Sequence, residues 1–420
     1  MRTNAHADLP LHHGRVPPWL ANRMATLGRA IVESILTEYG KEEFMKRISD
    51  PLWFQSFGAV MGMDWHSSGI TTSVVGALKR AINPISHQLG IYVCGGRGRH
   101  SRKTPSELMQ IADKTGLDGH HLVRCSRLSA KVDNTAIQDG FQIYLHSFIL
   151  TAEGDWAVVQ QGMNEQNAYA RRYHWHASEF DSFIKDPHTS ICGQNQGLIL
   201  NLSHQKADET HQGILDIVGQ HPTRMMEEIR KIRMPARHDV KAKDLDLRRL
   251  GSIIALANER EMLDFESLLL LKGLGPRTLQ SLTLVSEVIH GTPSRFEDPA
   301  RFSFAHGGKD GKPFPVPLKV YDETIATLRK AVDKAKIGHS DRQKAIKSLH
   351  DTATRIEQNF VPNDNFDKLV EKEWEDSHKY GGRTVMDDWK EGKSYFAFEP
   401  TTASTAKKKS KVASNQLSLF

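Results

Sequence analysis

The chain has 420 residues, of which 39% are hydrophobic and 25% are charged, so it can bury a core and form about two to three domains. No apolar stretch approaches the roughly 18 residues of a membrane helix, and no secretion signal is recognisable, so we expect a cytoplasmic protein with no membrane partner. Three widely spaced cysteines exclude a disulfide scaffold and a four-cysteine zinc site. The formal net charge of +6 permits binding to nucleic acid.

The first elements along the chain are expected to be helices. Apolar residues at helical spacing predict a helix that follows Pro17-Pro18 and ends at Gly40. Asp50 as an N-cap with Pro51 at the first helical position predicts a second helix. Residues 71–82 carry a third helical pattern.

A short strand and a further helix are expected next. Residues 91–93 read as a buried strand that ends at Gly95-Gly96. Thr104 and Glu107 have the spacing of a capping box, which predicts a helix start at that point.

The middle of the chain changes to β-forming residues. Aromatic and β-branched residues dominate 141–150, 156–161 and 170–175, with a turn at 153–155, which predicts a three-stranded antiparallel meander. Residues 245–290 and 318–360 return to helical patterns. We therefore expect an α+β fold that is mainly helical, with a small antiparallel sheet in the N-terminal half and a helix-hairpin-helix region after it.

Four regions follow from these patterns. Residues 5–234 form the expected α+β domain, with the candidate catalytic residues, and 235–360 form the helical DNA-binding region, entered through a polar linker at 235–244. Residues 361–399 are a peripheral extension. Residues 400–420 are rich in Thr, Ala, Ser and Lys and are expected to be a disordered tail.

An apolar, glycine, apolar, glycine pattern marks residues 268–278 as a helix-hairpin-helix element. Glycines allow the backbone N–H groups to approach a phosphate, and the following helix directs its positive end at the same oxygen. Such an element binds DNA backbone and reads no sequence. The alternative is an ordinary helical hairpin. The residues predicted to contact DNA are Lys272, Gly273, Leu274, Gly275, Arg277 and Thr278.

Base-excision glycosylases that contain a helix-hairpin-helix carry a catalytic Asp close to that hairpin. Residues 288–293 contain no carboxylate, which argues against a glycosylase.

The last five residues resemble the peptide that binds the bacterial sliding clamp. Apolar anchors on a polar tail have no core of their own to join, so they predict a partner with a surface pocket. The alternative is a tail that folds back on the body of the protein. The residues predicted to bind the clamp are Gln416, Leu417, Ser418, Leu419 and Phe420.

Polar residues in the N-terminal half are candidates for phosphodiester chemistry. Carboxylates bind hard cations such as Mg²⁺ or Mn²⁺, which predicts metal ligands at Asp64, Asp133 and Asp139. Asp64 and Asp133 could equally be caps or core hydrogen-bond partners. Strand alternation is expected to put Tyr144 and His146 on one face of the sheet and Arg172 and His174 on one face. The further candidate catalytic residues are His66, Lys131, His146, Arg171, Arg172 and His174.

Two further loops carry basic residues and glycines. Arg97 and Arg99 lie in a basic loop after the expected strand, which could contact DNA backbone or be a solvated loop. Lys309 lies in a glycine-rich loop that could hold another phosphate or form a tight turn. No Walker sequence follows the glycines, so no nucleotide cofactor is indicated.

Several of these groups together resemble the family known as domain of unknown function 763, over about residues 8–350. The resemblance implies a DNA-associated protein with an embedded helix-hairpin-helix and a suspected nuclease role, and it brings no catalytic residue that can be carried over. The groups that carry it are Asp64-Trp65-His66-Ser67-Ser68-Gly69, Ala130-Lys131-Val132-Asp133-Asn134, Val158-Val159-Gln160-Gln161-Gly162-Met163, Ala170-Arg171-Arg172-Tyr173-His174-Trp175 and residues 304–311.

Three functions remain open from the sequence. The first is a nucleoid-associated, metal-dependent DNA nuclease that acts in repair or replication and is recruited by the sliding clamp. The second is a non-catalytic DNA-binding accessory factor with the same hairpin and tail. The third is a DNA lyase or glycosylase that uses Lys131 as a Schiff-base nucleophile.

Overall fold

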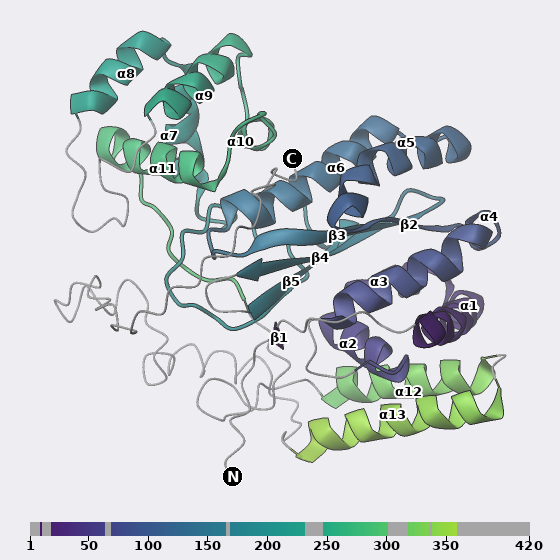
Figure 1. Ribbon diagram of the computed structural model, residues 1–420. Coiled ribbons are helices and arrows are strands. Elements are labelled where there is room, and N and C mark those ends of the chain that lie inside the picture. The colour runs from purple at the N-terminus through teal and green to yellow at the C-terminus, as the bar shows by residue number, and fades with distance from the viewer. Residues whose placement is uncertain are drawn as a thin grey trace, which may run out of the picture.

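The computed structural model describes residues 9–10, 18–63, 69–164, 169–231, 247–300, 318–335 and 338–358. A central antiparallel sheet has helices on both faces and a further group of helices at one end (Figure 1). The expected α+β class, mainly helical with the sheet in the N-terminal half, is confirmed. None of the described helices is long and apolar enough to cross a membrane.

Three helices form the layer on one face of the sheet: α1 (Pro18–Ser49), α2 (Pro51–Val60) and α3 (Gly69–Ile82). Gly40 interrupts α1 with φ of 86°, a left-handed value that favours glycine, so the predicted helix end is a break within a longer helical run. Asp50 caps α2 as predicted, because its carboxylate accepts from the backbone N–H of Trp53 at 2.6 Å. The predicted helix at 71–82 is confirmed as α3.

The opposite face is covered by α5 (Thr104–Thr115) and α6 (Gly119–Lys131), which follow α4 (Ser86–Leu89) and β2 (Ile91–Arg97). β2 is longer than predicted and continues through both glycines. The helix start at Thr104 is confirmed, but the capping box is wrong. Glu107 instead accepts from Lys79 Nζ and from the backbone N–H of Gly95, both at 2.7 Å.

The predicted meander is confirmed as β3 (Gln142–Thr151), β4 (Trp156–Asn164) and β5 (Tyr169–His176). The strand order is β1-β5-β4-β3-β2, all neighbours are antiparallel, and β6 (Ser190–Cys192) also pairs with β5. The short strand β1 (Leu9–Pro10) lies at the edge beside β5.

A register shift between Ile143 and Leu145 changes the expected faces of β3. The Tyr144 hydroxyl accepts from Gln161, and Tyr144 packs in the core on the α1–α3 side, whereas His146 bonds to Ser126 of α6. The prediction that Tyr144 and His146 share a face is therefore wrong. A β-bulge inserts one residue and reverses the alternation beyond it.

A group of helices packs at one end of the sheet, in one continuous core with the α5–α6 face. These helices are α7 (Asp208–Gly219), α8 (Pro222–Lys231), α9 (Leu247–Glu259), α10 (Phe265–Leu269) and α11 (Pro276–His290). The expected linker at 235–244 lies outside the described residues.

Two helices from late in the chain return to the N-terminal layer. α12 (Leu318–Lys334) packs on α1, and α13 (His339–Gln358) packs on α2 (Figure 1). The described parts of the expected 235–360 region therefore lie in two places, α9–α11 at the end of the sheet and α12–α13 beneath α1 and α2. The expected regions 361–399 and 400–420 lie outside the described residues.

Candidate functional site

The candidate catalytic residues divide between the two faces of the sheet. Along β5, Tyr173 and Trp175 pack in the core under α5 and α6, and Arg171 extends on the same face toward the loop that carries Asp298. Arg172 and His174 lie on the other face, and their sharing of a face is confirmed, because Arg172 Nε donates to His174 Nε2 at 2.8 Å. The sheet thus separates residues that the sequence grouped into one centre.

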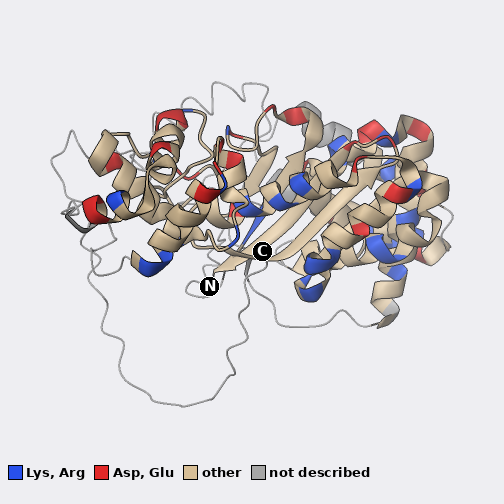
Figure 2. Ribbon diagram, turned by 90° about the horizontal axis from the view of Figure 1, so that it is seen from above, with Lys and Arg blue, Asp and Glu red and all other residues tan. Residues whose placement is uncertain are grey.

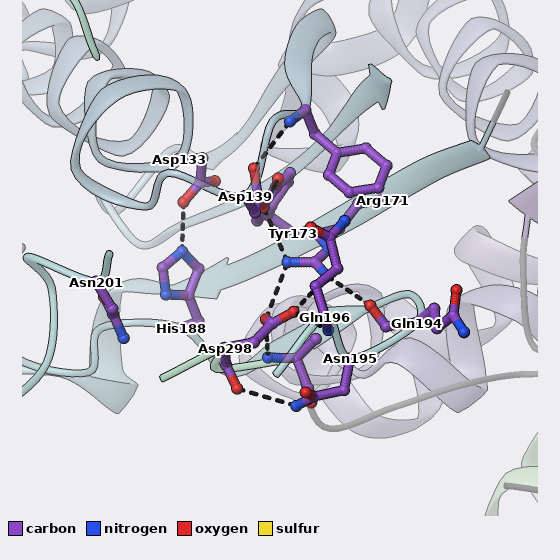
Figure 3. A network of polar contacts seen from close by, with 12 residues as sticks. Asp133, Asp139, Arg171, Tyr173, His188, Gln194, Asn195, Gln196, Asn201 and Asp298 are labelled. Atoms are coloured by element: carbon purple, nitrogen blue, oxygen red, sulfur yellow. Dashed lines mark hydrogen bonds and ion pairs between the residues drawn. The ribbon is translucent and has the colours of Figure 1, made fainter. Parts of the chain in front are cut away.

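Asp133 is the hub of the first buried polar network (Figure 3). α6 continues into a single π-helical turn, η3 (Val132–Ala136), in which Ile137 N donates to Val132 O at 3.0 Å, and this turn carries Asp133 over the sheet. The Asp133 carboxylate accepts from His188, Gln160 and the indole N–H of Trp175. Both oxygens are therefore occupied by protein donors.

His146 extends this network toward α6. Its Nδ1 lies 2.8 Å from Gln160 Oε1 and its Nε2 lies 2.8 Å from Ser126 Oγ. Burial lowers the pKa of His146, which is fully enclosed, so the neutral imidazole is favoured. The arrangement fixes the core under α6 and gives His146 no access to a substrate.

Arg171 joins two carboxylates in the second network (Figure 3). Its Nη1 donates to Asp139 Oδ2 at 2.9 Å, and its guanidinium forms a two-pronged pair with Asp298 at 2.9 and 2.7 Å. The Tyr173 hydroxyl donates to Asp139 at 2.6 Å, and the Phe141 N–H donates to the other Asp139 oxygen at 3.0 Å. All three charged groups are buried, so this network ties the segment after α11 to the sheet.

The free energy of unfolding should change with pH as Asp139 titrates. Burial raises the pKa of Asp139 to about 6, and Arg171 opposes that rise only in part. The folded protein then binds a proton that the unfolded chain releases, so this contribution to stability is lost as pH rises from about 4 to about 6. We expect Asp139→Asn, measured by urea unfolding, to gain stability relative to wild type across that interval. A constant difference between the two proteins would contradict the raised pKa.

Arg172 and His174 serve the packing of α2 on the sheet. Arg172 Nη1 donates to Gln55 Oε1 at 2.8 Å, and its guanidinium stacks 4.7 Å from the centre of the Phe54 ring. Burial, reinforced by Arg172, holds the pKa of His174 well below its ordinary value, so a neutral ring accepts the Arg172 bond.

A metal centre of the expected kind does not fit the described part of the chain. Within it, no group of three or more His, Cys, Asp or Glu side chains is arranged to hold an ion. A cation at Asp133 or Asp139 would have to displace protein donors from oxygens that are already hydrogen-bonded. Asp64 and His66 lie outside the described residues.

Lys131 connects α6 to the turn formed by residues 270–275 between α10 and α11. Its Nζ donates to the Leu274 carbonyl at 2.7 Å, and nearby Gln138 donates to the Pro276 carbonyl at 2.9 Å. Burial, followed by the charge of Arg249, lowers the pKa of Lys131 to about 8. The predicted catalytic lysine is thus committed to the backbone of the turn.

The 270–275 turn presents a basic, backbone-rich surface to solvent. Gly273 has φ of 93°, Lys272, Gly273 and Arg277 are exposed, and Arg249 Nη2 donates to the Gly273 carbonyl at 3.1 Å. Leu274 and Thr278 point inward, and both are buried. The N-cap of α11 is Gly275, and no side chain in the described residues caps the helix there.

Arg97 and Arg99 lie away from this turn in sequence; Arg97 is the last residue of β2, Arg99 lies in the segment that follows, and both are exposed. Arg97 stacks over the Tyr144 ring at 5.6 Å. Lys309 and residues 416–420 lie outside the described residues.

Sequence reasoning missed two partners in these networks, His188 and Asp298. Asp298 is 127 residues from Arg171, and backbone bonds from Glu297 and Asp298 to residues 199 and 197 bring it there. No local pattern signals such a pair. The alternation of β5 could have separated Arg171 from Arg172, because successive strand residues face opposite sides.

Comparisons with known proteins add one finding. A family model described as "Protein of unknown function (DUF763)" matches residues 5–316. No curated protein and no solved structure matches the chain.

Proposed function

The chain belongs to the DUF763 family of proteins of unknown function, and we propose from its own residues that it binds the DNA backbone through a helix-hairpin-helix formed by α10, the 270–275 turn and α11. The observation that carries the proposal is the glycine turn that leads into the start of α11, in which Gly273 is exposed and Gly275 is half-buried, flanked by the exposed Lys272 and Arg277. Unbonded N–H groups at a helix start, together with cationic side chains, suit a phosphate.

The anchoring of the turn also supports binding. Lys131 and Arg249 donate to the carbonyls of Leu274 and Gly273, and Gln138 donates to the carbonyl of Pro276 at the start of α11. These three side chains fix the backbone of the turn. A preorganised backbone loses less entropy when it binds. Because phosphates are common to every base pair, the expected binding is independent of sequence.

Two observations favour a binding factor over a nuclease. The carboxylates of Asp133 and Asp139 are buried and their oxygens are engaged by protein donors. Arg171, one of the candidate catalytic residues, is fully enclosed between Asp139 and Asp298. Cutting of single-stranded, duplex or flap DNA by the wild-type protein with Mg²⁺ or Mn²⁺ would contradict this choice.

The hairpin is tested by the double variant Lys272→Gln/Arg277→Gln. If each side chain contacts one phosphate, the slope of log affinity against log salt should fall by about 1.8, at roughly 0.9 per contact. Fluorescence anisotropy with duplexes of unrelated sequence measures both the slope and the lack of sequence preference. Lys344→Gln/Lys347→Gln on α13 removes the same charge from exposed positions and serves as the control. Equal slopes for the two double variants would refute the hairpin's role.

We further propose that residues 416–420 bind the bacterial sliding clamp, on the sequence resemblance of that pentapeptide alone. Deletion of these residues should abolish binding to the clamp and leave affinity for bare DNA unchanged, because the anchors Leu419 and Phe420 carry no charge for phosphate. Surface plasmon resonance with immobilised clamp or immobilised DNA measures the two affinities separately. Equal loss of both would overturn this assignment.

A further inference from the structure

Residues 97–103 form a second basic surface outside the hairpin. Arg97, Arg99, Arg102 and Lys103 are all exposed, and none of them forms an ion pair with a carboxylate among the residues that the structure describes. Elsewhere on the molecule Lys and Arg are interspersed with Asp and Glu (Figure 2). Four neighbouring cations repel one another, and a polyanionic partner would relieve that repulsion.

The backbone on both sides of this segment is fixed by hydrogen bonds. Lys79 of α3 donates to the Gly95 carbonyl at 2.8 Å and to Glu107 at 2.7 Å, and Glu107 accepts the Gly95 N–H at 2.7 Å. The carboxylate of Glu107, four residues after Lys103, is thus neutralised by Lys79. At the other end, Ser101 and Thr104 are buried and donate to the carbonyls of Gly98 and Ser101. The basic side chains therefore project from an anchored backbone.

The position of the segment relates it to the hairpin. α5 and α6 pack against each other and are joined by only three residues, 116–118, so they run antiparallel. The start of α5, which follows Lys103, therefore lies toward the end of α6. That end of α6 carries Lys131, which bonds to the 270–275 turn. Arg127, exposed one turn before Lys131, adds a cation to this end of α6.

We propose that residues 97–103 form a second backbone contact, so that one continuous DNA duplex spans the hairpin and this segment across the end of the α5–α6 pair. The inference rests on the proposed function of the hairpin. It extends that function from a single contact with the phosphate backbone to the choice of a particular kind of DNA. The ligand is duplex DNA long enough to reach both surfaces, and its sequence is immaterial, because both surfaces offer only charge and backbone groups.

The test compares two triple variants of the full chain. The loop variant is Arg99→Gln/Arg102→Gln/Lys103→Gln. The control is Lys114→Gln/Lys344→Gln/Lys347→Gln, which removes equal charge from exposed sites at the far end of α5 and on α13. Probes are labelled duplexes of about one and about three helical turns. On the longer duplex, the loop variant should reduce the salt slope by about 2.7 relative to the control, at roughly 0.9 per contact. On the shorter duplex the two triple variants should bind alike.

The hairpin variant Lys272→Gln/Arg277→Gln, measured alongside, should lose affinity for both duplexes. If the loop variant matches its control on the longer duplex while the hairpin variant binds weakly, the spanning contact is overturned and the hairpin stands. Equal losses by the loop variant on both lengths would also overturn spanning. If the hairpin variant binds both duplexes with wild-type affinity, the proposed function of the hairpin in DNA binding is itself refuted. Urea unfolding midpoints equal to wild type ensure that each loss reflects contacts.

Discussion

Replacing Arg171 by methionine is expected to destabilise the protein by about 3–5 kcal/mol, the cost of removing one partner from a buried ion pair. Asp139 and Asp298 would remain buried without their shared cation. The bond from Arg171 Nη2 to the Gln194 carbonyl, 2.6 Å long, would also be lost. Since Asp298 enters the core from the segment after α11, the connection between that segment and the sheet should loosen first.

Equilibrium urea unfolding of Arg171→Met measures the loss, and hydrogen exchange of residues 293–300 reports the local loosening. Arg99→Met, which removes a cation from an exposed position, is the matched control and should change stability by less than about 0.5 kcal/mol. Arg171→Lys keeps the charge but cannot form the two-pronged pair with Asp298, so its stability should fall between the other two. If Arg171→Met unfolds at the midpoint of Arg99→Met, the network does not stabilise the fold.

Gly95→Ala is expected to cost about 3 kcal/mol or more, because backbone strain and a steric clash act together. Gly95 has φ of 80°, and a Cβ at this position would lie 2.3 Å from the carbonyl oxygen of His146 and 2.7 Å from Thr104 Oγ1. The oxygen belongs to the backbone of the neighbouring strand, so it cannot move without opening the β2–β3 pairing.

Two other glycines separate the contributions to this effect. Gly98→Ala also places alanine at a positive φ, 56°, but its Cβ would meet nothing within 4 Å, so strain alone should cost about 1–2 kcal/mol. Gly76→Ala lies inside α3 with open space around it and should be neutral or slightly stabilising. Thermal or urea unfolding of the three variants should give that order. Equal stability of Gly95→Ala and Gly98→Ala would show that β2 adjusts to the clash.

Local signals in the sequence predicted several elements whose structure depends on neighbouring residues. The Asp50 cap, the helix at 71–82 and the meander between residues 142 and 176 were predicted, because caps, helical spacing and β-branched runs act over a few residues. The α+β class followed from the same signals. The composition of the 268–278 segment also indicated two helices around a glycine turn, and α10 and α11 lie there.

The roles of the polar residues were decided only by the tertiary structure. A single bulge in β3 moved Tyr144 to the opposite face from His146. Asp133 and Asp139, which by residue type could bind a metal, instead belong to two buried networks. His188 reaches Asp133 from a distant segment, and Arg171 joins Asp139 to the distant Asp298. Lys131 donates a hydrogen bond to a carbonyl of the hairpin turn. A carboxylate or an amine has the same chemistry in any chain, and only the groups that folding brings within hydrogen-bond distance determine whether it supports the core or meets a ligand.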